Sequence, residues 1–217
     1  MSNWFNQVRE NTDYILEAIK KQSFITELLE GSLSEETFQF YIHQDVLYLA
    51  DYKKVLAMVG LKCTQSSDMQ FFLGAATEVV AVENEMHQLF LKNELTNTEP
   101  SPSCELYTSY LTKMAGNFSV EEGLAAVLPC FTIYKEIGDY ILANQKNKKD
   151  NPYQNWIHTY GGEEFAKSVT QAIQITNNYA MKASDETVQK MNNAFEKSSK
   201  LEWMFWESAY KKEQWKI

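Results

Sequence analysis

The sequence has few of the residues that interrupt helices. Its 217 residues include only 8 Gly and 4 Pro, whereas an all-β fold needs many turns built from these residues. Apolar residues instead recur at three- and four-residue spacing, which is the period of a helix. With 44% apolar content, the chain is long enough to bury one substantial core. We therefore expect an all-α multi-helix bundle that forms a single domain over residues 1–217.

Positive charge and long apolar runs are also scarce. The chain has 20 Lys and Arg against 29 Asp and Glu, a net charge of -9, so the phosphates of a nucleic acid would be repelled. No window approaches the roughly 18 consecutive apolar residues of a membrane span. Residues 1–15 lack the basic and apolar segments of a signal peptide. We expect a cytoplasmic protein that binds neither nucleic acid nor membrane.

Metal-binding patterns are missing as well. The three cysteines, Cys63, Cys104 and Cys130, are widely spaced and form no CxxC pair, which argues against a zinc site and against a disulfide framework. None of the three histidines has a glutamate three positions earlier, as a di-iron bundle would require. Glu83 and His87 lie one turn apart, but such a pair more often forms a surface hydrogen bond. We predict no metal, although composition alone leaves haem open because haem needs only one histidine.

Capping residues and apolar periodicity predict the order of the helices. Gly31 can supply a left-handed stop, Ser34 can cap a long helix, and Ser119 with Glu122 has the spacing of a capping box. The polar stretch NQKNKKDNP, residues 144–152, is predicted to be a surface loop. The predicted helices cover residues 5–19, 24–31, 34–61, 69–93, 101–116, the segment around Cys130, a short segment up to Gly161 and Gly162, 163–180, and 185–217.

One carboxylate falls within an aromatic stripe of the second long predicted helix. Phe38, Tyr41, Asp45, Tyr48 and Tyr52 follow one another at steps of three or four, so they share one helix face. Asp45 is therefore predicted to point inward. A buried carboxylate needs a partner, so from the pattern alone Asp45 is either bonded to tyrosine hydroxyls or anchors a ligand.

The last helix repeats this anomaly. Glu202 lies on one side with Phe195, Phe205 and Trp206, and desolvation there would raise its pKa toward neutrality. Glu207 falls nearer the edge of the same face. The alternative is that Glu202 lies at the rim of a core or in an ion pair.

Cys130 follows a proline in the apolar run AAVLPCFTIYKEIGDYI and shares a face with Ala126, Tyr134, Ile137 and Ile141. Free cysteine is often buried simply as a small hydrophobe, so the pattern alone favours packing. The chain also has 12 Tyr, 12 Phe and 5 Trp. Aromatic rings with one or two carboxylates would suit a flat, nitrogen-rich heterocycle.

Five strings, read in order, carry a resemblance to a known family. They are FITELLEGSLSEETFQFYIHQDVLYL, YTSYL, LPCFTIYKEIGDYI, YQNWIHTYGG and LEWMFWESAY. Their order and spacing resemble the TenA/thiaminase II family nearly end to end, in the branch that has a cysteine. The resemblance implies a haem-oxygenase-like helical bundle, a homotetramer, and hydrolysis of aminopyrimidines in thiamin salvage without a cofactor.

The resemblance also implies roles for individual residues. Cys130 corresponds to the nucleophile, Glu202 to the acid and base, and Asp45 to the carboxylate that holds the pyrimidine. The remaining substrate-binding residues that it implies are Tyr48, Tyr107, Tyr134, Tyr160 and Phe205.

One departure from the family pattern stands early in the chain. Many members have His-Pro-Phe where this chain has Gln22, Ser23 and Phe24, which counts against haem and affects the expected pocket mouth. Two other hypotheses keep the fold. One is a pyrimidine- or thiamin-binding regulatory protein without turnover, and the other is a cofactor-independent oxidase that would not need Cys130.

Overall fold

The computed structural model describes residues 3–90, 99–146 and 150–216. For residues 80–90 it describes the backbone only. These residues form ten helices and no strand, which confirms the all-α prediction. None of the described helices is long and apolar enough to cross a membrane. The helices are α1 (Trp4–Asn11), α2 (Asp13–Lys20), α3 (Ser23–Glu30), α4 (Glu35–Lys62), α5 (Ser66–Phe90), α6 (Pro102–Asn117), α7 (Val120–Asn144), α8 (Gln154–Gly161), α9 (Glu163–Ala180) and α10 (Asp185–Lys211).

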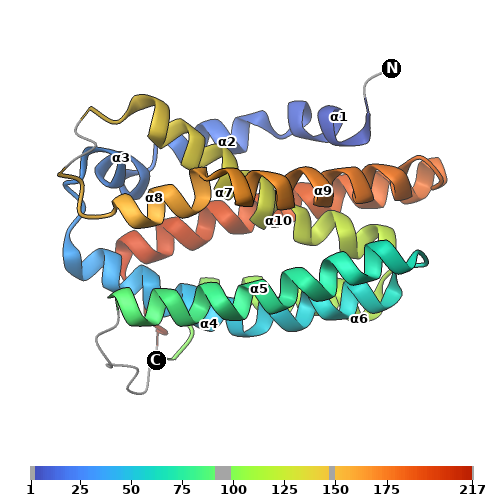
Figure 1. Cartoon of the computed structure of the whole chain (residues 1–217), viewed down its shortest axis with the longest axis horizontal. Coiled ribbons are helices and arrows are strands. Elements are labelled where there is room, and N and C mark those ends of the chain that lie inside the picture. The colour runs from blue at the N-terminus through green and yellow to red at the C-terminus, as the bar shows by residue number, and fades with distance from the viewer. Residues whose placement is uncertain (1–2, 91–98, 147–149, 217) are drawn as a thin grey trace.

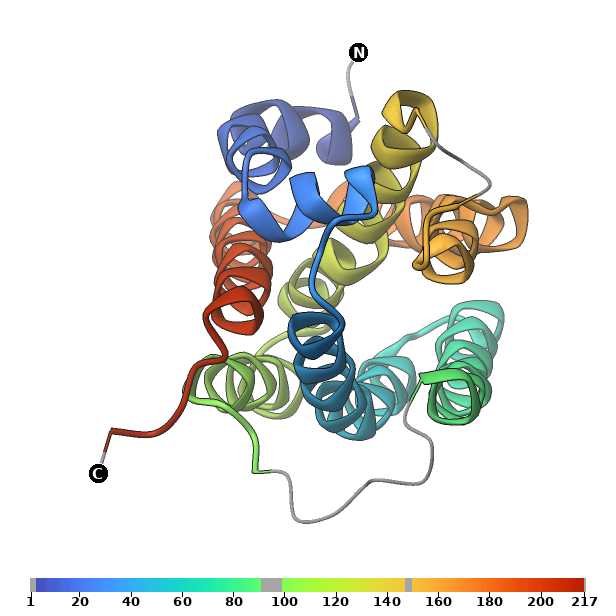
Figure 2. The same cartoon turned by 90° about the vertical axis from the view of Figure 1, so that its left-hand side faces the viewer.

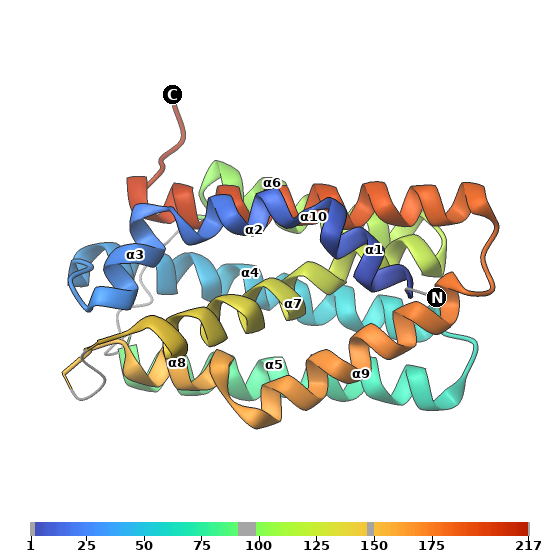
Figure 3. The same ribbon diagram turned by 90° about the horizontal axis from the view of Figure 1, so that it is seen from above.

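The long helices run roughly side by side, and α7 lies in the middle of them (Figure 1, Figure 2). This helix packs against α4, α6, α8, α9 and α10, and most of its side chains are buried. Viewed from above, α1 and α2 lie end to end along α10 (Figure 3). A residue on α7 can therefore meet side chains from several other helices.

The predicted caps are present. Ser34 accepts a hydrogen bond from the backbone N–H of Thr37, and Ser119 and Glu122 form both bonds of a capping box. Gly31 ends α3 with a φ of 75°, a left-handed conformation that glycine adopts without strain. These local signals fix where α3 stops and where α4 and α7 begin.

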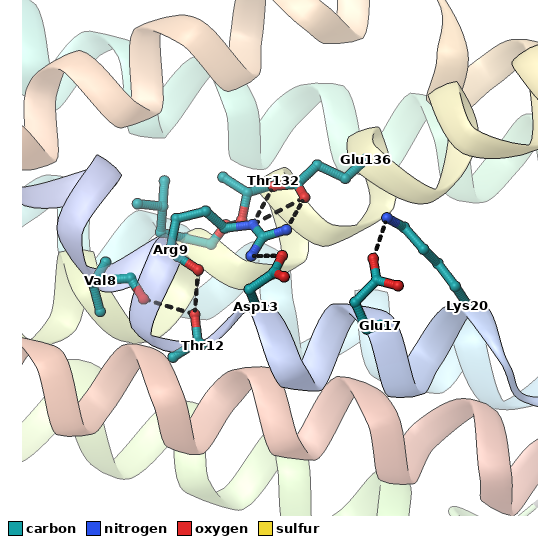
Figure 4. A network of polar contacts seen from close by, with 9 residues as sticks. Val8, Arg9, Thr12, Asp13, Glu17, Lys20, Thr132 and Glu136 are labelled. Atoms are coloured by element: carbon teal, nitrogen blue, oxygen red, sulfur yellow. Dashed lines mark hydrogen bonds and ion pairs between the residues drawn. The ribbon is translucent and has the colours of Figure 1, made fainter.

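The prediction of one helix over residues 5–19 is wrong, because the helix is interrupted at Thr12, between α1 and α2. The Thr12 hydroxyl donates to the carbonyl oxygen of Val8 at 2.8 Å. On α1, Arg9 pairs with Asp13 and, through two nitrogens, with Glu136 of α7 (Figure 4). The interruption lets two short helices follow the surface of the bundle, while the Arg9–Glu136 pair connects α1 to the central helix α7.

Other boundaries differ less. Helix α5 begins at Ser66 rather than Met69, and α10 ends at Lys211. The predicted end of α5 at Asn93 lies outside the described residues. So do residues 147–149 of the predicted loop.

Helices α7 and α8 approach each other closely at Gly138. A Cβ atom at this position would lie 2.6 Å from the backbone nitrogen of Gly161 and 2.7 Å from the carbonyl carbon of Tyr160. Glycine is therefore required for this contact, since such distances are shorter than van der Waals contact. The contact holds the end of α8 beside Tyr134, which lies one turn before Gly138 on α7.

Candidate active site

A cavity of about 110 Å³ lies between α4, α5, α7 and the α8–α9 region. Asp45 and Cys130 line it, and six of its fourteen described lining residues are aromatic. The described residues that line it are Asp45, Tyr48, Leu49, Tyr52, Ala75, Glu78, Val79, Cys130, Phe131, Tyr134, Thr159, Tyr160, Phe165 and Ser168. An enclosed space of this size suits one small ring rather than a drug-sized molecule.

Asp45 points inward, as predicted, and only 2% of its surface is exposed. Burial raises its pKa to about 7, and hydrogen bonding to the Tyr41 and Tyr134 hydroxyls offsets part of this shift. The Tyr41 hydroxyl oxygen lies 3.4 Å from that of Tyr134 and accepts a hydrogen bond from Trp156 at 3.1 Å. The Asp45 Oδ2 atom has no hydrogen-bond partner among the described residues. This oxygen is available to a ligand, because a buried polar atom favours a partner.

Cys130 is half-buried and contributes to the cavity wall. Pro129 precedes it inside α7, and since proline has no N–H, the carbonyl of Ala125 loses its helical partner. Desolvation raises the pKa of the thiol well above its usual value, and the charge of Glu202 raises it further. The Tyr48 and Tyr52 hydroxyls act in the opposite direction. The thiol is therefore protonated at neutral pH, and it needs a base or a cation to become a thiolate.

Glu202 lies behind this wall with 1% of its surface exposed. Its Oε1 accepts a hydrogen bond from the Tyr107 hydroxyl at 2.8 Å. Burial raises its pKa to about 8, the Tyr107 bond lowers it in part, and the charge of Asp45 raises it. Ionising both carboxylates is therefore unfavourable, so at neutral pH the pair retains a proton. Glu207 is instead partly exposed and pairs with Lys211 at 2.5 Å.

Aromatic rings connect these groups. The Tyr134 and Tyr160 rings lie 4.7 Å apart, and the nearly parallel Tyr48 and Tyr52 rings lie 5.3 Å apart. Behind Tyr48, the rings of Tyr107 and Phe205 lie 5.0 and 5.6 Å from it. The lining thus offers ring faces for stacking with polar groups at the floor.

The structure gathers the residues singled out in the sequence into two layers. Asp45, Tyr48, Cys130, Tyr134 and Tyr160 line the cavity itself. Tyr107, Glu202 and Phe205 form the layer behind it, in contact with Tyr48 or with one another.

Tyr41 and Tyr52 are also part of the site, although the sequence identified them only as members of the aromatic stripe on α4. Tyr41 contacts Tyr134, and Tyr52 lines the cavity while donating to the carbonyl of Val127 at 2.9 Å. Their spacing of four and seven residues from Asp45 was the available signal. Gln22 lies at the start of α3, where its side chain donates to the carbonyl of Trp203 at 2.8 Å. It therefore contacts the backbone beside Glu202.

We also considered metal sites and the other surface depressions as candidate functional sites. Among the described residues, no group of three or more His, Cys, Asp or Glu could hold a metal ion. The Glu83 and His87 side chains lie outside the described ones. A larger depression of about 540 Å³ between the start of α5 and α9 is open, and among the described residues it contains no buried carboxylate or thiol.

Replacing Asp45 with asparagine is expected to stabilise the fold increasingly as pH rises from 5 to about 7, with the difference level above that pH. The folded-state pKa of about 7 lies above the ordinary value of 3.8 for an aspartic acid, so between these two pH values the folded state binds a proton that the unfolded state lacks. The stability that this provides is full below about pH 4 and is lost as pH approaches 7. Asparagine removes this loss, so at pH 8 the variant is expected to exceed the wild type by roughly 2 to 4 kcal/mol.

Thermal unfolding of both proteins between pH 5 and 8 measures this difference. Asp51→Asn is the matched control, because Asp51 lies on the same helix but is partly exposed and paired with Lys54. Parallel stability curves for wild type and Asp45→Asn would contradict the raised pKa of Asp45.

Comparison with known proteins identifies the family. Residues 10–212 match the TENA/THI-4/PQQC family, and the chain therefore belongs to it. A protein of Halalkalibacterium halodurans named aminopyrimidine aminohydrolase is 33% identical over 95% of each chain.

Solved structures agree. A TenA homologue from P. horikoshii OT3 superposes with a TM-score of 0.86 and 28% identity, covering 97% of this chain and 99% of that one. A Shewanella denitrificans OS217 domain described as having a heme oxygenase-like fold gives a TM-score of 0.77 at 16% identity over 96% and 92% of the two chains. The predicted family and the haem-oxygenase-like fold are thus confirmed.

Proposed function

We propose that this protein is an aminopyrimidine aminohydrolase with thiaminase II activity, which releases 4-amino-5-hydroxymethyl-2-methylpyrimidine in thiamin salvage. The name of the Halalkalibacterium relative and the family match support this activity. The observation that carries it is the cavity, where an aromatic wall surrounds the thiol of Cys130 and the carboxyl group of Asp45. This arrangement fits an aminopyrimidine ring better than an elongated or strongly anionic substrate.

Asp45 would hold the pyrimidine. Its unpartnered Oδ2 can accept a hydrogen bond from the ring's amino group, and its pKa of about 7 allows it to share a proton with a ring nitrogen. The Tyr134 and Tyr160 rings supply faces on which the pyrimidine can stack. Protonation or strong hydrogen bonding withdraws electron density from the ring, which prepares a ring carbon for nucleophilic attack.

Cys130 would act as the nucleophile and Glu202 as the acid and base. The thiol loses its proton as the electron-poor ring binds, the sulfur adds to a ring carbon, and Glu202 takes up the proton. The bond from the exocyclic methylene to the amine or thiazolium then breaks, and a leaving group that needs a proton receives it through Glu202. Water loses a proton to Glu202 as it adds at the methylene, and when the C–S bond breaks the sulfur takes a proton back from Glu202, which restores the ring and the thiol.

Domain organisation, partners, oligomeric state and cellular location are part of the same proposal. The family match over residues 10–212 supports a single domain over the chain, and the net charge of -9 argues against nucleic acid. Leu61 and Met181, 70% and 76% exposed, would be covered in the homotetramer that the family resemblance implies. We propose a cytoplasmic enzyme, since the reducing cytoplasm keeps a catalytic thiol free.

Hydrolysis of 4-amino-5-aminomethyl-2-methylpyrimidine and of thiamin by the wild-type protein tests this function. We expect hydroxymethylpyrimidine to form from both, and chromatography of the products would measure it. Binding without turnover would favour a regulatory binding protein, while oxygen consumption with a dihydro-heterocycle would favour an oxidase.

A further inference from the structure

Helix α5 contributes one charged side chain to the mouth of the cavity. Ala75, Glu78 and Val79 line it at steps of three and four, so one face of α5 forms this wall. Ala75 is buried, whereas Glu78 is exposed. Across the cavity, the exposed Thr159 belongs to α8, which faces α5 in the view along the bundle (Figure 2). Glu78 therefore lies where the cavity opens to solvent, while Asp45 lies at the floor.

The charges along this wall have one sign. Among the described lining residues, Asp45 and Glu78 are the acidic side chains and no lysine or arginine is present. None of the ion pairs between described residues engages Glu78. Its carboxylate is therefore available to a ligand at the mouth, and the potential there favours a cation.

The size of the cavity determines which part of a substrate meets this charge. A volume of about 110 Å³ accommodates one ring. With the pyrimidine held at the floor by Asp45, the substituent on its exocyclic methylene has to extend toward the mouth. An alkyl amine is an ammonium cation at neutral pH because its pKa lies well above 7, and a thiazolium is a cation because its nitrogen is quaternary.

We propose that Glu78 determines specificity by selecting pyrimidines whose leaving group is cationic over derivatives whose leaving group is neutral. This inference rests on the proposed function for the placement of the ring. Glu78 attracts the leaving group during binding and takes no part in bond breaking, so its effect falls mainly on KM. Because Glu78 is exposed, we expect a moderate effect of about threefold, which decreases in concentrated salt.

Two substrates with the same ring test this proposal. The aminomethylpyrimidine carries an ammonium group, whereas its N-formyl derivative is neutral. In Glu78→Gln we expect kcat/KM for the amine to fall about threefold at low salt, and in Glu78→Lys about tenfold. The formyl derivative should change by less than a factor of about 1.5. Asp68→Asn is the control, because it removes one charge from the same helix outside the cavity.

Equal losses for the two substrates, or no loss for the amine, would overturn the role of Glu78. Calorimetric binding of both compounds to wild type and Glu78→Gln provides a readout independent of turnover. If the wild type hydrolyses neither compound, the proposed function fails. Selective weakening of amine binding in Glu78→Gln would then still support cation selection, and its absence would reject it.

Discussion

Replacing Cys130 with alanine is expected to lower hydroxymethylpyrimidine release by at least about a thousandfold, because no other described thiol lines the cavity. The fold should survive, since the side chain is small and only half-buried. Steady-state turnover of the aminomethylpyrimidine measures the loss, and circular dichroism with thermal unfolding monitors the fold. Cys130→Ser should be similarly inactive, because a serine hydroxyl is far harder to deprotonate than a thiol.

Cys63→Ala is the matched control for this prediction. Cys63 follows the end of α4 and lies outside the cavity wall, so its loss should leave turnover within about a factor of two. Activity of Cys130→Ala within tenfold of the wild type would refute nucleophilic attack by this thiol. That outcome would favour a reaction that does not need the cysteine.

Replacing Glu202 with glutamine is expected to lower kcat by about 10² to 10⁴, the usual contribution of a general acid or base. Glutamine keeps the shape and can still accept a hydrogen bond from Tyr107, so the effect should fall on kcat more than on KM. With a wild-type pKa of about 8, the carboxylate that accepts the thiol proton forms as pH rises. The corresponding rise of kcat/KM with pH should disappear in Glu202→Gln.

Glu207→Gln provides the comparison on the same helix. Glu207 is partly exposed and paired with Lys211, so its replacement should change kcat by no more than about twofold. The rise of kcat/KM with pH should also remain. A pH–rate profile of Glu202→Gln that retains the wild-type rise would assign the proton transfer to another group, with Asp45 the next candidate.

The sequence predicted the inward carboxylates for a clear physical reason. Asp45 and Glu202 interrupt apolar helix faces, and helical periodicity then fixes which way they point. Cys130 was different, because a cysteine on an apolar face matches ordinary packing. Its position beside Asp45 depends on how α4 and α7 pack, and without the family resemblance the pattern favoured a structural role.

Other features could not be predicted because they depend on tertiary contacts. The break at Thr12 has no proline or glycine to announce it, and the Arg9–Glu136 pair joins residues far apart in sequence. Glu78 is an exposed glutamate on a helix, a very common pattern, and only the assembled cavity distinguishes it from other surface charges.

The close contact at Gly138 means that part of the cavity's width is set by main chain rather than by side chains. The backbone of α8 rests directly on α7 there, so no rotamer change at that point can move the Tyr160 wall. The Tyr134 and Tyr160 rings lie 4.7 Å apart and contact each other, so a ligand meets them as one continuous surface. Substitutions elsewhere can alter the shape of the cavity, but moving this surface would require α8 to shift as a body. The Gly138 contact therefore fixes how far this aromatic pair can be displaced, whatever side chains line the rest of the cavity.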